Sequence, residues 1–289
     1  MDNIVLKVQE LHKKYASGAG IKNVSFNIEK GTIVGVIGLN GAGKSTLFSC
    51  ITNPLKRDGG NVIFQGKELE YKDCNSFHDI GVIDCEQGYP EDFNAKNISK
   101  IMKYTYSNWN ERVFKKILED FGIDIKKKIG NYSTGMKSKL SIALALSHNA
   151  KLLILDEPTN GLDLQARSFV RKYLYDFVQD EEKAILLSSH IISDVEKIAD
   201  KIILLYQGSI ILECSKDDLL YKYATYRISN QRFSEIDKGC MVRYKPSEIF
   251  TTVLVENKDK FQAIYGLEPE LASVENIVEL FLEGEMPEC

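Results

Sequence analysis

The stretch of residues 31–48 constrains the fold of this chain more than any other part of the sequence. It reads GTIVGVIGLNGAGKSTLF, and four of its residues complete the phosphate-loop pattern G-x-x-x-x-G-K-[ST], namely Gly38, Gly43, Lys44 and Ser45. Residues 32–37 are apolar and rich in β-branched side chains, which predicts a buried strand, and residues 45–51 predict a helix. A glycine-rich turn between such elements directs backbone N–H groups and the helix dipole at one point. The stretch therefore predicts a polyphosphate site.

The residue types in this loop each suit that chemistry. Gly38, Gly41 and Gly43 allow the backbone to approach phosphates and to adopt positive φ, where a Cβ atom would clash. Lys44 supplies a positive charge for the β- and γ-phosphates, and the hydroxyl of Ser45 is a ligand for Mg²⁺. We therefore expect a bound nucleotide triphosphate with its magnesium ion.

Composition excludes several other classes of protein. The chain has 289 residues, of which 44% are hydrophobic and 27% charged, as expected for a globular protein with a sizeable core. Its net charge of −4 does not predict a nucleic-acid surface. No apolar run reaches the roughly 18 to 20 residues that cross a bilayer, and the first residues lack the pattern of a signal peptide. The six cysteines have no C-x-x-C spacing, which predicts reduced thiols in a cytoplasmic protein.

A second informative stretch is a buried strand that ends in two acids. Residues 152–155 are aliphatic, and Asp156 and Glu157 follow directly. A buried parallel strand rarely places adjacent carboxylates at its end without a use for them. We expect Asp156 to hold Mg²⁺ and Glu157 to polarise a water molecule at the γ-phosphate.

Two further side chains are candidates for nucleotide contact. Residues 184–189 predict another buried strand, which places His190 at the same edge of the sheet, where it can contact phosphate. Tyr15 follows a first strand; its aromatic ring either packs at the strand end or provides a surface on which adenine stacks.

The remaining sequence predicts two further regions. Residues 84–149 show helical spacing of apolar residues and predict a mostly helical insert, in which Tyr104, Tyr106 and Trp109 belong to the helix core or, alternatively, face a partner. Ser133 precedes a long apolar helix as its N-cap. After residue 222, short strands at 226–229, 241–244 and 251–255 and an amphipathic helix at 274–281 predict a small α+β appendage.

In their order along the chain, these motifs resemble those of the nucleotide-binding subunits of the ABC family of ATPases. The motifs are GLNGAGKST, YSTGMK, LLILDEPT, NGLD and SSH, and the resemblance covers about residues 2–222. It implies an α/β fold with a RecA-like phosphate-loop core, an antiparallel β-subdomain, a helical subdomain at about 84–149, and an accessory domain at 223–289. It also implies that two subunits, identical or different, sandwich two ATP molecules.

The resemblance assigns roles to individual residues. Each ATP would lie between residues 38–46 of one subunit, including Asn40, Ala42 and Thr46, and Ser133 and Gly135 of the other. Tyr15 falls where the family stacks adenine, Glu157 matches the catalytic base, and His190 matches the residue that senses γ-phosphate. Asp163 lies in the loop that touches the opposite subunit.

The sequence departs from the family pattern at two places. The signature reads YSTGM where the family commonly has LSGGQ, although Ser133 and Gly135 are retained. The family usually has a glutamine after the strand at 80–83, where it reaches Mg²⁺ and couples to the membrane partner; here Cys85 occupies that position, and Glu86 or Gln87 can substitute.

We therefore predict the ATPase of a membrane transporter, resembling bacterial export subunits that include those of antibiotic or peptide resistance. Its permease would be a separate polypeptide, and the chain would lie peripherally on the inner face of the cell membrane. The first alternative is a soluble ABC ATPase of translation or DNA repair, although those proteins carry paired domains or long coiled coils that this sequence lacks. The second is a module that closes on ATP without hydrolysis, which the intact Lys44, Asp156, Glu157 and His190 argue against. The sequence leaves the cargo and the direction of transport open.

Overall fold

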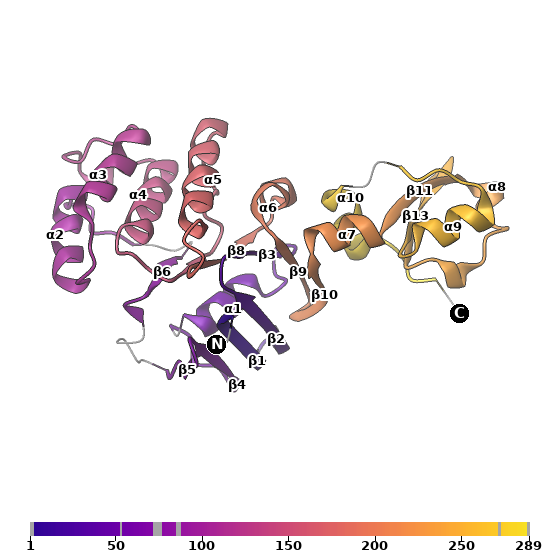
Figure 1. Cartoon of the computed structure of the whole chain (residues 1–289), viewed down its shortest axis with the longest axis horizontal. Coiled ribbons are helices and arrows are strands. Elements are labelled where there is room, and N and C mark those ends of the chain that lie inside the picture. Colours follow the sequence, from indigo (N-terminus) through magenta and orange to yellow (C-terminus); the bar gives the residue numbers. More distant parts are fainter. Residues whose placement is uncertain (1–2, 53, 72–76, 85–87, 271–272, 288–289) are drawn as a thin grey trace. The chain divides into compact units, whose positions relative to one another are not determined.

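The computed structural model describes residues 3–52, 54–71, 77–84, 88–270 and 273–287. The chain forms two compact units, Met1–Leu212 and Glu213–Cys289 (Figure 1). This division lies before α7 (Lys216–Lys222), whereas the sequence predicts a nucleotide-binding domain at 2–222 and an accessory domain at 223–289. Those functional boundaries stay a prediction.

The first unit is organised around a sheet with the strand order β10-β9-β3-β8-β7-β6. Its strands are β3 (Ile33–Ile37), β6 (Ile80–Ile83), β7 (Leu152–Leu155), β8 (Ala184–Ser189), β9 (Lys201–Tyr206) and β10 (Ser209–Ser215). The neighbours from β9 to β6 pair in parallel. Every residue of β3, β7 and β8 is buried, as expected where helices cover both faces of a parallel sheet. This is the predicted α/β core.

A second sheet has the order β2-β1-β4-β5. It consists of β1 (Ile4–Lys14), β2 (Gly20–Glu29), β4 (Gly59–Phe64) and β5 (Lys67–Glu68), which pair antiparallel. Buried and more exposed residues mostly alternate along β2, because one face of the sheet packs on the core. The antiparallel β-subdomain is therefore confirmed.

Helices connect the core strands. They are α1 (Lys44–Ile51), α5 (Leu164–Val178) and α6 (Ile192–Ile198). Helix α5 is capped at its N-terminus by Asp163, whose carboxylate accepts a hydrogen bond from the N–H of Ala166 at 2.7 Å. Helix α6 packs closely on β3, because a Cβ atom built at Gly35 would lie 2.2 Å from Cγ1 of Val195.

The described part of residues 84–149 is mostly helical, as the sequence predicts. It contains α2 (Ala95–Thr105), α3 (Glu111–Asp120), a 3₁₀ turn (Ile129–Asn131) and α4 (Thr134–Leu146), which group together in Figure 1. Tyr106 stacks on His148 with ring centroids 4.3 Å apart, and Trp109 packs on Phe114. The assignment of Tyr104 to the helix core is wrong, because 94% of this residue is exposed.

The second unit is the predicted α+β appendage. Its sheet has the order β11-β13-β12 and is built from β11 (Ala224–Ser229), β12 (Arg243–Pro246) and β13 (Phe250–Val255). Its helices are α7, α8 (Asn230–Phe233), α9 (Lys258–Tyr265) and α10 (Val274–Glu283). Strand β12 begins at Arg243, two residues later than the predicted strand at 241–244. The reason is that a 3₁₀ turn capped by Asp237 occupies Lys238–Cys240 just before it.

Two turns with the same Gln-Gly sequence differ in how tightly they pack. Gln65-Gly66 joins β4 to β5 with φ of 48° and 80°, and Gln207-Gly208 joins β9 to β10 with φ of 47° and 81°. Both therefore have the left-handed backbone of a type I′ hairpin. A Cβ atom at Gly66 would meet nothing within 4 Å, whereas one at Gly208 would lie 2.3 Å from the carbonyl oxygen of Gly20.

We expect Gly208→Ala to lower the free energy of unfolding more than Gly66→Ala does. Both variants carry the strain of a left-handed alanine, about 1–2 kcal/mol, but only Gly208→Ala adds overpacking, worth about 1–3 kcal/mol more. Urea unfolding measured side by side gives the difference. Equal losses would contradict the close approach of Gly20 and Gly208.

Candidate functional site

The phosphate loop connects β3 to α1. The helix begins after Gly43, which has φ 106° and provides no side-chain cap. The first N–H groups of a helix have no partner within it, so this end can bind an anion. Gly38 is also required, because its Cβ atom would lie 2.6 Å from the carbonyl oxygen of Leu205. Of the other predicted contact residues, Asn40, Gly41 and Ser45 are exposed, Gly43 and Thr46 are half-buried, and Ala42 is buried.

Lys44 lies inside the loop rather than in solvent. Its Nζ donates to the carbonyl oxygen of Gly38 at 2.7 Å and lies 3.7 Å from Oε1 of Glu157. The side chain is buried, so its charge is compensated by these oxygens. The positive charge of Lys44 thus lies between the N-terminus of α1 and Glu157, one of the two acids that follow β7.

Contacts between backbones place the turn that carries Tyr15 beside the phosphate loop. Gly208 donates its N–H to the carbonyl oxygen of Ala42 at 2.9 Å, and its own carbonyl accepts from Lys22 at 2.7 Å. A Cβ atom at Gly43 would lie 3.3 Å from the carbonyl oxygen of Gly20, at the start of β2. Tyr15, 39% exposed, lies at the other end of the same turn. Adenine stacking on its ring stays a prediction. The sequence analysis did not predict that Gly208 contacts the phosphate loop. The Gln207-Gly208 pair, which is typical of a tight turn, was the one sequence signal for this position.

Asp156 follows β7 and is buried. Its Oδ1 accepts a hydrogen bond from the hydroxyl of Ser188, a residue of β8 that the sequence analysis did not single out. The pairing of Leu155 with Leu187 predicts this contact, because the next positions of the two parallel strands then lie side by side. Within the described residues no group of three His, Cys, Asp or Glu side chains could hold a metal by itself. Asp156 and Ser45 would offer one carboxylate and one hydroxyl to Mg²⁺, which usually keeps waters and phosphate oxygens as its other ligands; that they hold the ion stays a prediction.

Glu157 has a backbone conformation that is unusual for a side chain of its size. Its φ is 51°, in the left-handed region. Its N–H donates to the hydroxyl of Ser188 at 3.0 Å, which helps to hold this conformation. Strain of about 1–3 kcal/mol at such a residue is characteristic of functional sites.

His190 follows β8 and contacts the same carboxylate. Its Nδ1 lies 2.7 Å from Oε2 of Glu157, and its backbone N–H donates to that oxygen at 3.3 Å. With Nδ1–H donating to Glu157, Nε2 remains for another partner. The structure therefore brings Lys44, Glu157 and His190 into one chain of contacts, as the sequence predicts for their positions; their roles in catalysis stay predictions.

Ser133 and Gly135 lie at the start of α4. The hydroxyl of Ser133 accepts from the N–H of Met136 at 3.2 Å, which confirms the predicted N-cap. A Cβ atom at Gly135 would lie 2.7 Å from the carbonyl oxygen of Gly161, so this helix start packs on the loop before Asp163. Across the described ranges, no hydrogen bond joins Ser133 or Gly135 to the phosphate loop of the same chain.

The three candidates for the position after β6, Cys85, Glu86 and Gln87, lie outside the described residues. Among those that the structure describes, Cys50, Cys214 and Cys240 form no disulfide; that they are reduced thiols stays a prediction. Nor is any described helix both long enough and apolar enough to span a bilayer.

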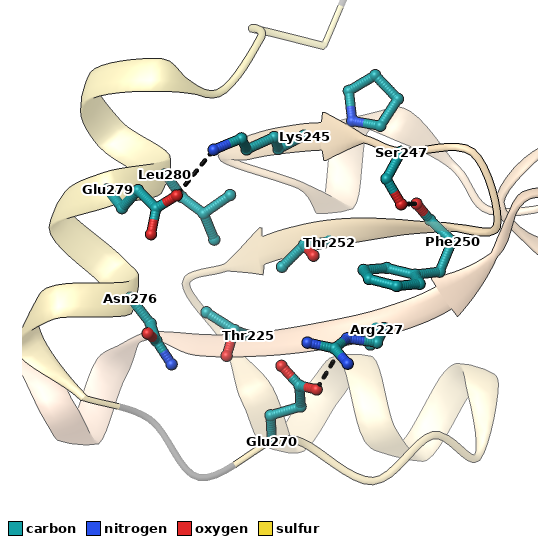
Figure 2. A pocket seen from close by; sticks show the side chains of 11 residues that line it. Thr225, Arg227, Lys245, Ser247, Phe250, Thr252, Glu270, Asn276, Glu279 and Leu280 are labelled. Atoms are coloured by element: carbon teal, nitrogen blue, oxygen red, sulfur yellow. Dashed lines mark hydrogen bonds and ion pairs between the residues drawn. The ribbon is translucent and has the colours of Figure 1, made fainter.

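The second unit has a separate hollow of about 260 Å³, shown in Figure 2. Arg227 pairs with Glu270 at 3.2 Å on one side of it, and Lys245 pairs with Glu279 at 2.7 Å on the other. Oγ1 of Thr225 is buried here without a hydrogen-bond partner among the described residues. The charges of this hollow are thus paired with one another, and none of the predicted nucleotide-site residues lines it.

Comparisons with known proteins agree with this geometry. The family model described as "ABC transporter" matches residues 21–160. The lantibiotic transport ATP-binding protein SrtF of Streptococcus pyogenes is 38% identical over 215 residues, which are 74% of this chain and 92% of that protein. The bacitracin transport ATP-binding protein BcrA of Bacillus licheniformis is 30% identical over 232 residues, which are 78% of this chain and 76% of that protein. A solved ATP-binding subunit of an ABC transporter superposes with a TM-score of 0.68 at 25% identity and covers 75% of this chain and 92% of that one.

We expect Lys44→Ala to weaken the binding of ATP by roughly 10- to 100-fold, because a charge-assisted hydrogen bond contributes about 1.5–3 kcal/mol. The affinity can be measured by titration with a fluorescent ATP analogue. The matched control is Lys30→Ala, which removes a lysine paired at the surface with Glu182 in the same unit. Unchanged affinity in Lys44→Ala would contradict the assignment of the loop.

Proposed function

The chain is an ATPase of the ABC transporter family, and on that premise we propose that it powers an exporter whose membrane-spanning subunit is a separate polypeptide. The observation that carries the catalytic part of this proposal is the contact chain from Lys44 through Glu157 to His190. A cation, a carboxylate and an imidazole thus contact one another near the N-terminus of α1, which supports the proposal that the phosphates of ATP bind there.

The residues divide the work of hydrolysis among them. Lys44 and the N–H groups of α1 bind the β- and γ-phosphates. Ser45 and Asp156 would hold Mg²⁺, which would neutralise phosphate charge. Glu157 accepts a proton from the water that attacks the γ-phosphorus atom. His190 fixes the orientation of the Glu157 carboxylate through Nδ1 and contacts the γ-phosphate through Nε2.

A second nucleotide-binding subunit completes the site. Ser133 and Gly135 lie at a helix start, which is suited to bind phosphate. No hydrogen bond among the described residues connects them with the phosphate loop of their own chain. We therefore assign them to the ATP held by a partner subunit, either a second copy or a related chain, in a head-to-tail arrangement. Asp163, in the loop that packs on Gly135, would lie at the contact between subunits.

The permease would dock on the helical region. Ile101 and Tyr104 are 47% and 94% exposed, and their spacing places them on one side of α2. Exposed aromatic side chains of this kind are common at protein interfaces. This surface supports peripheral attachment to the membrane through a partner, at its cytoplasmic face.

The named relatives suggest the class of cargo. SrtF and BcrA are named for the transport of a lantibiotic and of bacitracin. We propose that the exporter acts on a peptide antibiotic of this general kind. The same relatives favour transport over the alternative of a soluble ATPase in translation or DNA repair.

Purification of the tagged full chain from detergent-solubilised cells tests the partnership. We expect a polytopic membrane protein to co-purify, and Tyr104→Glu to reduce its recovery about tenfold or more, because a buried charge opposes the contact. The control is Tyr221→Glu, which changes an exposed tyrosine of the second unit. Recovery of ribosomal or DNA-repair proteins without a membrane protein would contradict the transport proposal.

A further inference from the structure

The segment that follows the catalytic carboxylate is tied to the helix that follows His190. Oγ1 of Thr159 donates to Oδ2 of Asp194 at 2.9 Å, and Nη1 of Arg167 donates to the same oxygen at 3.2 Å. Nε of Arg167 also donates to the carbonyl oxygen of Leu162 at 3.1 Å. One guanidinium thus joins the segment 157–163 to α6.

The contact between Thr159 and Asp194 is buried, and the two contacts of Arg167 are partly buried. Asp194 is only 6% exposed and Thr159 5% exposed. A buried carboxylate needs compensating donors, and here Thr159 and Arg167 supply them. Neither Arg167 nor Asp194 contacts the phosphate loop through a recorded hydrogen bond in the described residues, so their effect on ATP must be indirect.

Further contacts hold both ends of this link. Asp194 lies on α6, whose Val195 packs against Gly35 of β3 so closely that Gly35 could not carry a Cβ atom. On the other side, Asn160 donates its N–H to the carbonyl of Glu157 at 3.1 Å, and Leu162 donates to that of Thr159 at 3.2 Å. Two consecutive turns therefore connect Thr159 and Leu162 to the backbone of Glu157.

We propose that Arg167 and Asp194 are positioning residues for ATP hydrolysis, which fix the segment 157–163 on α6 and so hold the carboxylate of Glu157 against His190. The inference rests on the proposed role of Glu157 as the base. Since the left-handed φ of Glu157 is strained, the surrounding contacts must maintain it. The link also joins the loop at Asp163, where the partner subunit would bind, to the helix that begins after His190.

Three variants test the link in the full-length chain. Asp194→Asn removes the charge at nearly constant size, Thr159→Val removes one donor at constant shape, and Arg167→Lys keeps the charge but cannot reach both acceptors. We expect kcat for ATP to fall roughly 10- to 100-fold, as for a small misplacement of a catalytic group. The dissociation constant of an ATP analogue should change less than about twofold, because the phosphate loop is untouched. Asp194→Glu, which restores the carboxylate, should recover part of kcat.

A double-mutant cycle separates positioning from general destabilisation. In a Glu157→Gln background, Asp194→Asn should cause no further fall in kcat, because the group that it positions is already gone. The control is Glu182→Gln, which breaks the exposed Lys30–Glu182 pair of the same unit and should leave kcat unchanged. If Asp194→Asn does not fold, Thr159→Val and Arg167→Lys provide the same comparison.

Any of three results would overturn the inference. The first two are kcat within twofold of the unchanged chain in the folded variants, and an equal and parallel loss of ATP affinity. An additive effect of Asp194→Asn on Glu157→Gln would also overturn it. If the unchanged chain with its partner does not hydrolyse ATP, the proposed function itself fails. If the unchanged chain hydrolyses ATP and all three variants retain its turnover, only the positioning role fails.

Discussion

Parallel hydrogen bonding among β3, β8 and β7 is the constraint on which the rest of the site depends. Ile37 pairs with Ser189, and Leu155 pairs with Leu187, so the carboxyl ends of the three strands meet at one edge of the sheet. The segments that follow them carry Lys44, Asp156 with Glu157, and His190. A shift of one residue in the pairing of β7 with β8 would separate Ser188 from Asp156 and turn alternate side chains of the shifted strand to the other face.

Close contact of glycine backbones is the second requirement. Gly20, Gly43 and Gly208 come from three different segments, and a Cβ atom at Gly208 would overlap Gly20. Because these backbones touch, the turn that carries Tyr15 lies against the phosphate loop. Likewise, the carbonyl oxygen of Gly161 lies where a Cβ atom of residue 135 would be, so the start of α4 packs against the segment after Glu157. The contacts of the phosphate loop with the turn of Tyr15, and of helix α4 with the segment after Glu157, therefore depend on positions where only glycine fits.

The sequence predicted those parts whose cause is local. Buried aliphatic runs predicted β3, β7 and β8, and the family resemblance carried by five ordered motifs implied which ends would meet. The structure then revealed contacts that depend on tertiary packing. Ser188 belongs to the SSH motif but was given no partner, and Asp194 was not singled out; their partners Asp156 and Arg167 lie 32 and 27 positions away. The sequence left Tyr104 either in the helix core or facing a partner, because sequence spacing does not reveal whether another element covers that side of α2. With 94% of the residue exposed, the core alternative is wrong. The start of β12 was predicted two residues early. The side chain of Asp237 caps a 3₁₀ turn at Lys238–Cys240, and the alternating pattern used to predict the strand does not reveal such a cap.

The central claim is that the carboxylate of Glu157 performs the hydrolysis of ATP bound at Lys44. Phosphate release by the Glu157→Gln chain, compared with the unchanged chain under identical conditions, tests it most directly. We expect ATP still to bind and an ATP-bound dimer to accumulate, while turnover falls by at least about 100-fold, as for loss of a general base. Turnover equal to that of the unchanged chain would contradict the account.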